Sequence, residues 1–570
     1  MRYRASLTAL VAMLTALACT SSGVAGPPAG TSYRASAPSR PGGTVELTDY
    51  EFPQMPTQLT ARTDAELRRA TMLFSPLWGL DPDLRSYPDL ARRVPTTANG
   101  GVRAARDGRS MTVDVRLVPG LRWSDGQPLT ADDVIFTWRA LRDPALRALA
   151  PAGLDRIQAM DRRSDTEVVW TFDGIDAAYV VLGAALPVLP AHRLRDVAPA
   201  AWAQADYFRR PDVVSGPFTV AESVPDDHLT LAANPQYADG RADPDAYPDG
   251  GAPFDHAPSL ERIVTRASAS KDAEIRTLLA GGADVGFHLL PGDLANLQGA
   301  SGSAPVVTTG LRDEFLNPNH GVDSATGQAP PWDDDPRVLR ALDEAVDRGG
   351  LVRDVLAGSG RPARGLFPRA LVPYASGTAL PAGPDLDAAR RLLDGAGWRP
   401  GPDGVRSRDG RRLAFSLLGI CGRPGGDVEL DRLRRQWEAV GASVTNSCQP
   451  RDAFLQRAAA GAFDMTVYSD QWAPDPSAWA AVGATGAIAN WNRCHDRTLD
   501  AAFARAGATL DPARRQVAAR DAERAWLAYR CTIPLFEWPD VRQVSAQLRN
   551  FVPNAAAADT WNAADWWTPA

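Results

Sequence analysis

The chain has 570 residues, 44% of them hydrophobic and 23% charged, a composition that predicts a large globular protein with two or three cores. The formal net charge is −7 at pH 7, and loss of a leader that carries Arg2 and Arg4 would make it −9. Such a chain has no basic excess for binding nucleic acid, and we expect no nucleic-acid partner.

The first 19 residues have the pattern of a secretory signal. A positive end is followed by an apolar stretch of about thirteen residues, which is shorter than the roughly 20 that a membrane span needs. Ala16-Leu17-Ala18 before Cys19 resembles the processing box of bacterial lipoproteins, which usually has Leu in place of Ala16. We expect lipidation of Cys19 and anchorage to the outer face of the cell membrane. The alternative is ordinary signal cleavage nearby, which would discard Cys19 and release a soluble exported protein.

Residues 20–43 are rich in Ser, Gly, Pro and Ala and cannot bury enough apolar surface to fold. We expect a flexible tether here. At about 5–6 Å × √n, it would hold the folded body within roughly 25–30 Å of its attachment point.

Several catalytic and nucleotide-binding motifs are missing from the sequence. The only lysine is Lys271, and Ser270 precedes it, so there is no GxxxxGK phosphate loop. The chain also has no GxSxG nucleophile motif and no HExxH metal-binding pair. We therefore expect no cofactor, no metal site and no enzymatic activity. An exported hydrolase with paired carboxylates stays open as an alternative, because the separation of such carboxylates is spatial.

A half-buried strand is predicted over residues 111–118, where apolar and polar residues alternate. The stretch LRWSDGQPLTADDVIFTWRAL (121–141) follows, with a turn at Asp125 and a helix start at Thr130. Asp132 and Asp133 then lie near the positive end of the helix dipole. We therefore assign these carboxylates structural rather than catalytic roles.

The same stretch, residues 121–138, closely resembles the signature of the family 5 extracellular solute-binding proteins, the peptide- and nickel-type receptors of ABC importers. Eight other stretches resemble segments of that family and occur in the family's order, so that the resemblance covers nearly all of the mature chain: 88–95, 215–224, 234–240, 278–287, 335–358, 389–413, 463–479 and 531–538.

The resemblance implies an α/β, two-lobed periplasmic-binding-protein-like fold (type II, cluster C) with an additional small α+β domain. It places lobe I at residues 44–65, 212–310 and 534–570, an inserted small domain at 66–211, and lobe II at 311–533.

The order of predicted strands and helices supports this architecture independently. Residues 411–469 alternate strand, helix, strand, helix, strand, and residues 261–289 read as strand, helix, strand. Such alternation implies parallel pairing with right-handed crossovers. Open parallel sheets bind ligands outside the carboxyl ends of their strands. We expect two separate parallel sheets whose carboxyl ends face each other across a cleft.

Four cysteines follow Cys19, and an even number in an exported chain predicts two disulfides, although three pairings are possible. Zinc binding is the alternative, but no CxxC spacing occurs. Cys421 and Cys448 follow strands at the same edge of the predicted sheet, which favours pairing them and leaves Cys494 with Cys531.

Candidates for ligand binding come from the strand ends and from the resemblance. The strand ends deliver Asp470 in lobe II and His288 in lobe I. In the peptide-binding members that the chain resembles, a Trp and an Asp within the segment matching 463–479 approach the ligand, and the Asp pairs with its N-terminal amine. Here the Trp is Trp472 and the Asp is either Asp470 or Asp475. Further candidates are Asp49, Tyr50, Asn317, Asn319, Asn490 and Trp491.

The resemblance implies a receptor that captures an oligopeptide or related small solute and delivers it to the permease of an ABC importer. Capture would occur by closure of the lobes about segments near 311–316 and 532–537. A receptor of the same fold for a metal chelate, an opine or a sugar is the alternative. The expected partners are the solute, the permease and, through the lipid anchor, the membrane; we expect a monomer.

Overall fold

The structure, a computed structural model, describes residues 33–37, 40–50, 61, 63–237 and 257–569. The expected signal and the lipidation of Cys19 lie outside the described residues. Among the helices of the described part, none combines the length and apolarity that a membrane span requires.

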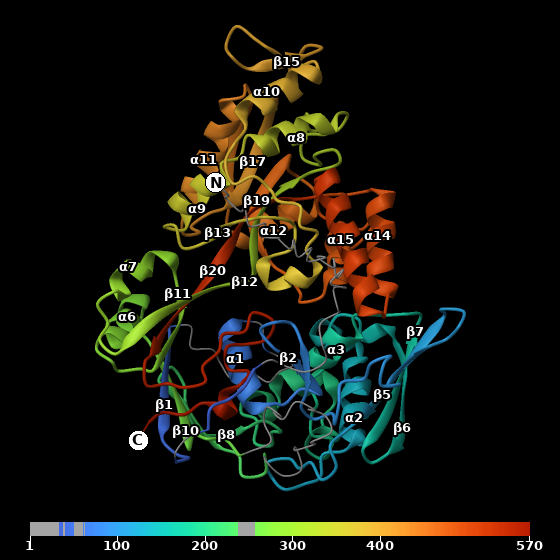
Figure 1. Ribbon diagram of the computed structural model, residues 1–570, viewed down its shortest axis with the longest axis vertical. Coiled ribbons are helices and arrows are strands. Elements are labelled where there is room, and N and C mark those ends of the chain that lie inside the picture. Colours follow the sequence, from blue (N-terminus) through green and yellow to red (C-terminus); the bar gives the residue numbers. More distant parts are fainter. Residues whose placement is uncertain (1–32, 38–39, 51–60, 62, 238–256, 570) are drawn as a thin grey trace, which may run out of the picture.

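One 11-stranded sheet runs through the molecule (Figure 1). Ten of its strands follow one another side by side, and β13 (Arg361–Pro362) pairs with β20 as a branch. The ten, in order across the sheet, are β18 (Ser443–Gln449), β17 (Ala414–Ile420), β19 (Met465–Gln471), β12 (Ser303–Pro318), β20 (Ile533–Ser545), β11 (Val285–Leu289), β1 (Thr44–Asp49), β10 (Arg262–Ala267), β9 (His228–Ala233) and β8 (Phe218–Val224).

Two parallel blocks lie within this sheet. In the first block β1 pairs in parallel with β10 and β11, and in the second β17 pairs in parallel with β18 and β19. The predicted parallel pairing is confirmed in both blocks. The prediction of two separate sheets is wrong, because the long antiparallel strands β12 and β20 lie between the blocks and join them into one. We call the part around β1 and β8 to β11 lobe I and the part around β17 to β19 lobe II.

Helices with one apolar side cover the sheet of lobe II. In α11 (Gly426–Glu438), Leu430, Leu433 and Trp437 are buried at helical spacing, and the Trp437 indole donates to the Leu342 carbonyl at 3.0 Å. The other helices of lobe II are α8 (Pro336–Glu344), α9 (Arg348–Val355), α10 (Leu386–Gly395), α12 (Arg451–Ala459), α13 (Ala480–Gly483), α14 (Arg497–Ala508) and α15 (Pro512–Tyr529), with α6 (Lys271–Leu279) and α7 (Leu294–Leu297) in lobe I.

A small domain beside lobe I carries the stretch 121–141 (Figure 1). Its sheet has the order β4 (Val102–Ala104), β5 (Ser110–Arg116), β7 (Glu167–Asp173), β6 (Ile157–Ser164), and β5 confirms the predicted strand. The helix α2 (Ala131–Leu141) starts as predicted, since Thr130 accepts from Asp132 N while Asp133 accepts from Thr130 N. Asp133 also accepts from Ala191 N at 2.8 Å, and Asp125 holds its turn by accepting from Gln127 N. The structural roles predicted for these carboxylates are confirmed.

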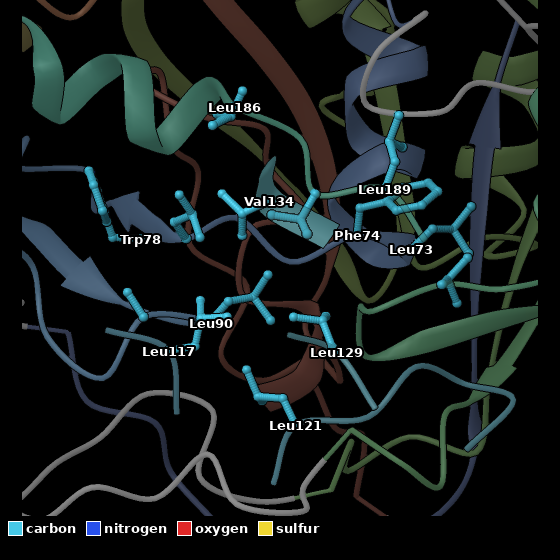
Figure 2. Close-up of a cluster of buried hydrophobic side chains, with 14 of the residues drawn as sticks. Leu73, Phe74, Trp78, Leu90, Leu117, Leu121, Leu129, Val134, Leu186 and Leu189 are labelled. Atoms are coloured by element: carbon cyan, nitrogen blue, oxygen red, sulfur yellow. The ribbon is translucent and has the colours of Figure 1, made fainter. Parts of the chain in front are cut away.

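The small domain and lobe I share one apolar core. Figure 2 shows Leu73 at the end of α1 (Asp64–Leu73), Phe74 directly after it, and Trp78 of β2 (Trp78–Leu80) in one cluster with Val134 of α2. Leu186, just after α3 (Tyr179–Ala185), belongs to the same cluster.

The remaining short strands are β3 (Ser86–Pro88), which pairs with β2, and β14 (Arg399–Pro400), β15 (Arg406–Arg408) and β16 (Arg411–Arg412) at the tip of lobe II. Two short helices are α4 (Ala191–Leu194) and α5 (Asp206–Arg209).

Both predicted disulfides are present. Cys421 follows β17 and bonds to Cys448 of the neighbouring β18, and Cys494 bonds to Cys531. The parallel register, which pairs Gly419 with Cys448, brings the first two cysteines to the same edge. The pairing predicted from the strand ends is therefore confirmed.

Part of the expected tether contacts the folded body. Ser36 donates through its backbone N–H and its hydroxyl to Asn550 Oδ1, and Trp567 donates to the Ser36 carbonyl. The Tyr33 ring lies edge-on to Trp561 at a centroid distance of 5.1 Å. The composition of residues 20–43 could not reveal this contact, because its partners lie more than 500 residues away in the sequence.

The small-domain core predicts a specific packing defect. A Cβ added at Gly183 in α3 would lie 1.9 Å from Cζ2 of the fully buried Trp78, so Gly183→Ala is expected to lower the free energy of unfolding by about 1–3 kcal/mol. Urea denaturation followed by tryptophan fluorescence measures the change. Gly299→Ala is the control, because nothing lies within 4 Å of its added Cβ. Equal stability of the two variants would contradict this account of the core.

Candidate functional site

Three adjoining cavities lie where the two parallel blocks approach each other. The largest has a volume of about 520 Å³ and is bounded by β11 of lobe I, by β12 and β20, and by the end of β19 in lobe II. A second, of about 370 Å³, extends into lobe II, and a third, of about 470 Å³, extends toward the small domain. We call the three together the interlobe cleft. Residues shared with the largest cavity connect the other two to it: Arg312, Arg451, Ser469 and Asp470 for the second, and Leu67, Leu311, Gln471, Ala555, Ala557 and Ala558 for the third.

The lobe I wall of the cleft is a charge cluster at the carboxyl ends of β1 and β11. The Asp49 carboxylate lies 2.6 Å from Arg68 Nη2 and 3.1 Å from His288 Nδ1. Burial acts to raise the pKa of Asp49, but the hydrogen bond with His288 and the charge of Arg68 outweigh it, and the pKa is lowered. Arg68 and His288 line the largest cavity, whereas Asp49 is buried behind them. The structure thus brings the predicted residues Asp49 and His288 together, with His288 toward the cavity.

Tyr50 forms the outer part of the same wall. Its side chain lines the largest cavity, and Lys271 Nζ lies 3.9 Å from the ring centroid in a cation–π contact. Lys271 also donates to Glu274 Oε2 at 3.1 Å and to the His288 carbonyl. The single lysine of the chain therefore supports the cleft wall from behind.

The lobe II wall lies at the carboxyl end of β19. Asp470 lines both the largest and the second cavity, and the only hydrogen bond that its carboxylate accepts within the described residues comes from Gln471 N at 2.9 Å. Burial raises the pKa of Asp470, while the bond from Gln471 N and the charge of Arg451 act to lower it. Trp491 lines the second cavity. The predicted Asp470 and Trp491 therefore lie on the same side of the cleft.

Trp472 belongs to both the wall and the core. It lines the third cavity, yet it is only 5% exposed, stacks on Trp479 with centroids 3.1 Å apart, and meets Phe315 edge-on at 5.0 Å. Truncation of Trp472 would therefore open this aromatic stack. Loss of the Trp472 side chain is therefore expected to lower the stability of the fold as well as to alter the cavity wall.

Besides Asp49, four predicted residues do not line these three cavities, and the structure shows their other contacts. Asn317 Nδ2 donates to the Phe315 carbonyl, and Asn319 Nδ2 donates to the carbonyls of residues 461 and 463. Asn490 bonds to the backbone at Ala484 and Cys494, next to the second disulfide. Asp475 is 2% exposed and lies 2.5 Å from Arg515 Nη2 while it caps the helical turn at Ser477. All four hold the backbone around the cleft in position.

The sequence interpretation missed several cleft residues. Arg451 begins α12 directly after β18, so the rule that ligands bind at strand ends could have found it. Arg68, Arg312 and Trp538 also line the largest cavity, but they come from a helix and from the crossing strands, whose registers the sequence does not define.

The sequence is similar to one family of known proteins. The sequence model of the bacterial extracellular solute-binding proteins, family 5, matches residues 87–488. The protein XP55 of Streptomyces lividans is 30% identical over 355 residues, which are 62% of this chain and 57% of XP55. The chain thus spans little more than half the length of this relative.

Solved structures show the same fold. The oligopeptide-binding protein AppA of Bacillus subtilis, in complex with a nonapeptide, superposes with a TM-score of 0.68 at 20% identity and covers 94% of this chain and 100% of its own. NikZ of Campylobacter jejuni, in complex with Ni(L-His), superposes with a TM-score of 0.67 at 17% identity, covering 92% and 99%. The predicted two-lobed α/β fold is confirmed by these likenesses.

Asp475 is expected to stabilise the protein rather than touch the solute. Asp475→Asn would leave the buried Arg515 guanidinium without its charged partner, at a cost of about 3–5 kcal/mol in the free energy of unfolding. Chemical denaturation measures the change. Asp431→Asn is the control, because its solvent-accessible pairs with Arg434 and Arg435 on the surface of α11 should contribute at most about 1 kcal/mol to the free energy of unfolding. An Asp475→Asn protein as stable as the wild type would show that the ion pair is dispensable.

Glu274 makes the stability of lobe I depend on pH. Burial raises its pKa from 4.5 to about 7 despite the nearby Lys271. The folded state therefore holds this proton more tightly than the unfolded chain. The resulting stability is present below pH 4.5 and is lost as the pH rises through 7. Glu274→Gln should remove this loss, up to about 3 kcal/mol between pH 4.5 and 8.

Urea titrations at several pH values measure the effect of Glu274. The exposed carboxylate of Asp272 in the same helix provides the control, since Asp272→Asn should keep the wild-type slope of stability against pH. If Glu274→Gln also keeps that slope, the carboxyl of Glu274 does not titrate as described.

Proposed function

The chain belongs to the bacterial extracellular solute-binding proteins of family 5, which are receptors rather than enzymes, and on this premise we propose that it captures a peptide or related small solute for an ABC importer. The observation that carries the proposal is the position of the interlobe cleft. Its two walls stand at the carboxyl ends of two parallel blocks, where open sheets bind their ligands.

Asp470 is the partner that we propose for the solute's ammonium group. Asp470 faces two cavities and forms no ion pair within the described residues, whereas Asp475 is occupied by Arg515. A cation enclosed in a closed cleft requires an acidic partner, because an unpaired buried charge costs several kcal/mol. His288, Tyr50 and Trp491 would contribute the remaining contacts from the two walls.

Closure of the lobes would occur where β12 and β20 change register. Thr309 pairs with Pro539 and Asp313 with Glu537, so a step of four residues on β12 faces a step of two on β20. Such a bulge bends a ladder locally. Leu311 and Arg312, within the bulge, line the cleft, so that bending here would move the two walls relative to each other.

The lobe I wall also carries apolar surface that closure would cover. Tyr50 and Leu67 are each 37% exposed and Leu290 is 39% exposed, and all three line the largest cavity. Exposed large apolar side chains gathered at one cavity are typical of a binding surface. A bound solute and the opposing lobe would remove them from water.

The same fold also accommodates other solutes. NikZ shares the fold and holds a nickel complex of histidine, so a receptor for a metal chelate is the second candidate, followed by one for an opine or a sugar. We further propose that the receptor works as a monomer. In this proposal lobe I comprises residues 44–65, 212–310 and 534–570, the inserted small domain residues 66–211, and lobe II residues 311–533. Cys19 would carry a lipid anchor on the outer face of the membrane, and a permease would receive the solute.

The peptide assignment is tested by identifying the solute and by removing its proposed charge partner. Native mass spectrometry of the isolated protein should detect a bound peptide. Asp470→Asn should then weaken that peptide about 10–100-fold in titration calorimetry, because a charge-assisted hydrogen bond is lost. Asp409→Asn is the control, since the Asp409 side chain is 95% exposed at the tip of lobe II. A co-purifying chelate or sugar, or unchanged affinity of Asp470→Asn, would contradict the peptide assignment.

A further inference from the structure

We propose that the pairing of β12 with β20 responds to pH at its bend, because two buried sets of ionisable side chains hold it there and each set retains one proton. The Arg369 set consists of Asp313, Glu537 and Arg369, and the Arg423 set consists of Glu314, Glu429 and Arg423. Both sets stand at the lobe II end of the register shift, where β12 and β20 pass between the lobes (Figure 1). The inference concerns the strands that join the lobes, so it goes beyond the proposed function and is independent of the solute.

The Arg369 set lies on one face of the sheet. Asp313 of β12 and Glu537 of β20 are opposite each other in the antiparallel register. Opposite residues point to the same face, with their Cβ atoms about 4.5–5.5 Å apart. Both side chains are buried, and Arg369 Nη1 lies 2.5 Å from Glu537 Oε1. Among the described residues, Asp313 has no ion-pair partner and its Oδ1 has no hydrogen-bond partner. Two carboxyl groups thus have one guanidinium between them.

The Arg423 set lies on the other face of β12. Glu314 follows Asp313 directly, and successive side chains of a strand point to opposite faces. Arg423 Nη1 lies 2.7 Å from Glu314 Oε2, and Arg423 Nη2 contacts Glu429 of α11. The Trp538 indole also donates to Glu314 Oε2, at 2.8 Å. Both carboxyl groups are fully buried, so this set again combines two carboxyl groups with one guanidinium.

The charge balance of each set requires a proton. If both carboxyl groups were ionised, each set would hold one excess negative charge, and a buried carboxyl takes up a proton rather than keep an uncompensated charge. The protonated group is the carboxyl with fewer polar contacts, which is Asp313 in the first set and Glu429 in the second. Burial and the neighbouring carboxylate raise the pKa of both groups, although the arginine of each set acts to lower it.

Other ionisable groups beside the two sets do not supply the missing positive charge. They are Arg312 of β12, Arg361 of β13, Tyr468 and Asp470 of β19, and Asp540 of β20. The two arginines are exposed, and water and salt screen exposed charges. Tyr468 stays neutral because burial raises its pKa. Asp470 lies opposite Asp313 on β19 and adds a further acidic group to the same row.

Rising pH removes the two protons and weakens the pairing of β12 with β20. The folded protein holds these protons more tightly than a locally opened state, in which the carboxyl groups regain ordinary pKa values. The stability that the protons provide is therefore present at low pH and is lost as the pH rises through the raised pKa values. For each proton released, the opening constant rises by at most about tenfold per pH unit. After proton loss, Asp313 and Glu537 repel each other across the two strands.

Hydrogen exchange followed by mass spectrometry measures the opening of residues 309–316 and 533–539 once the intrinsic exchange rate at each pH is divided out. In the wild-type protein, opening should rise at least tenfold from about pH 5 to about pH 8. The double variant Asp313→Asn, Glu429→Gln keeps both groups neutral, so its rise should stay within about twofold. Asp409→Asn removes a carboxylate that is 95% exposed and should keep the wild-type rise. Equal rises in the wild type and the double variant would overturn the proposal.

Two further measurements keep the result decisive. If the double variant fails to fold, Asp313→Asn and Glu429→Gln are measured singly; each should lower the wild-type rise at least threefold, and an unchanged rise in both refutes the proposal. Infrared spectroscopy detects protonated carboxyl groups by their C=O stretch. The wild-type band should exceed that of the variant at about pH 5 and lose this excess by about pH 9; no excess at either pH contradicts the retained protons. No solute is present, so these outcomes are separate from the peptide assignment.

Discussion

The antiparallel pairing of β12 with β20 holds the two lobes together in one molecule. These two antiparallel strands connect parallel blocks that have no other strand in common, and both blocks turn their carboxyl ends toward the space beside them. The cleft therefore depends on this pairing of β12 with β20. The two strands lie close together at the register shift, since a Cβ added at Gly310 would lie 2.3 Å from Asp540 Oδ2.

Buried charges fix the two ends of this ladder to different lobes. Toward lobe II, Glu314 binds Arg423 and the Trp538 indole, and Glu537 lies 2.5 Å from Arg369. Toward lobe I, Arg542 lies 2.6 Å from Asp559. A buried pair is costly to separate, so on the proposed closure each end would move with its own lobe. Bending would then be concentrated in the register shift between Thr309 and Asp313, where the described residues form no buried ion pair.

The sequence predicted the features that depend on local pattern. Strand and helix alternation gave the two parallel blocks, and the edge at which Cys421 and Cys448 emerge gave their disulfide. It could not predict the single continuous sheet, because antiparallel pairing of β12 with β20 joins residues more than 200 apart. Asp470 and Asp475 are equivalent by spacing, and only Arg515, 40 residues further along the chain, distinguishes them. Arg312 reaches the cleft through a bulge that has no sequence signature.

The contact between Ser36 and Asn550 has a mechanical consequence. Ser36 is bonded to Asn550 and Trp567, and the neighbouring Trp566 is part of the core that lobe I shares with the small domain, so a force applied through Ser36 would act first on lobe I. Any attachment of the leader to a surface would hold that half of the molecule still. Lobe II would then be the half that moves on closure. The position of its outer face relative to that surface would differ between the empty and the solute-bound protein.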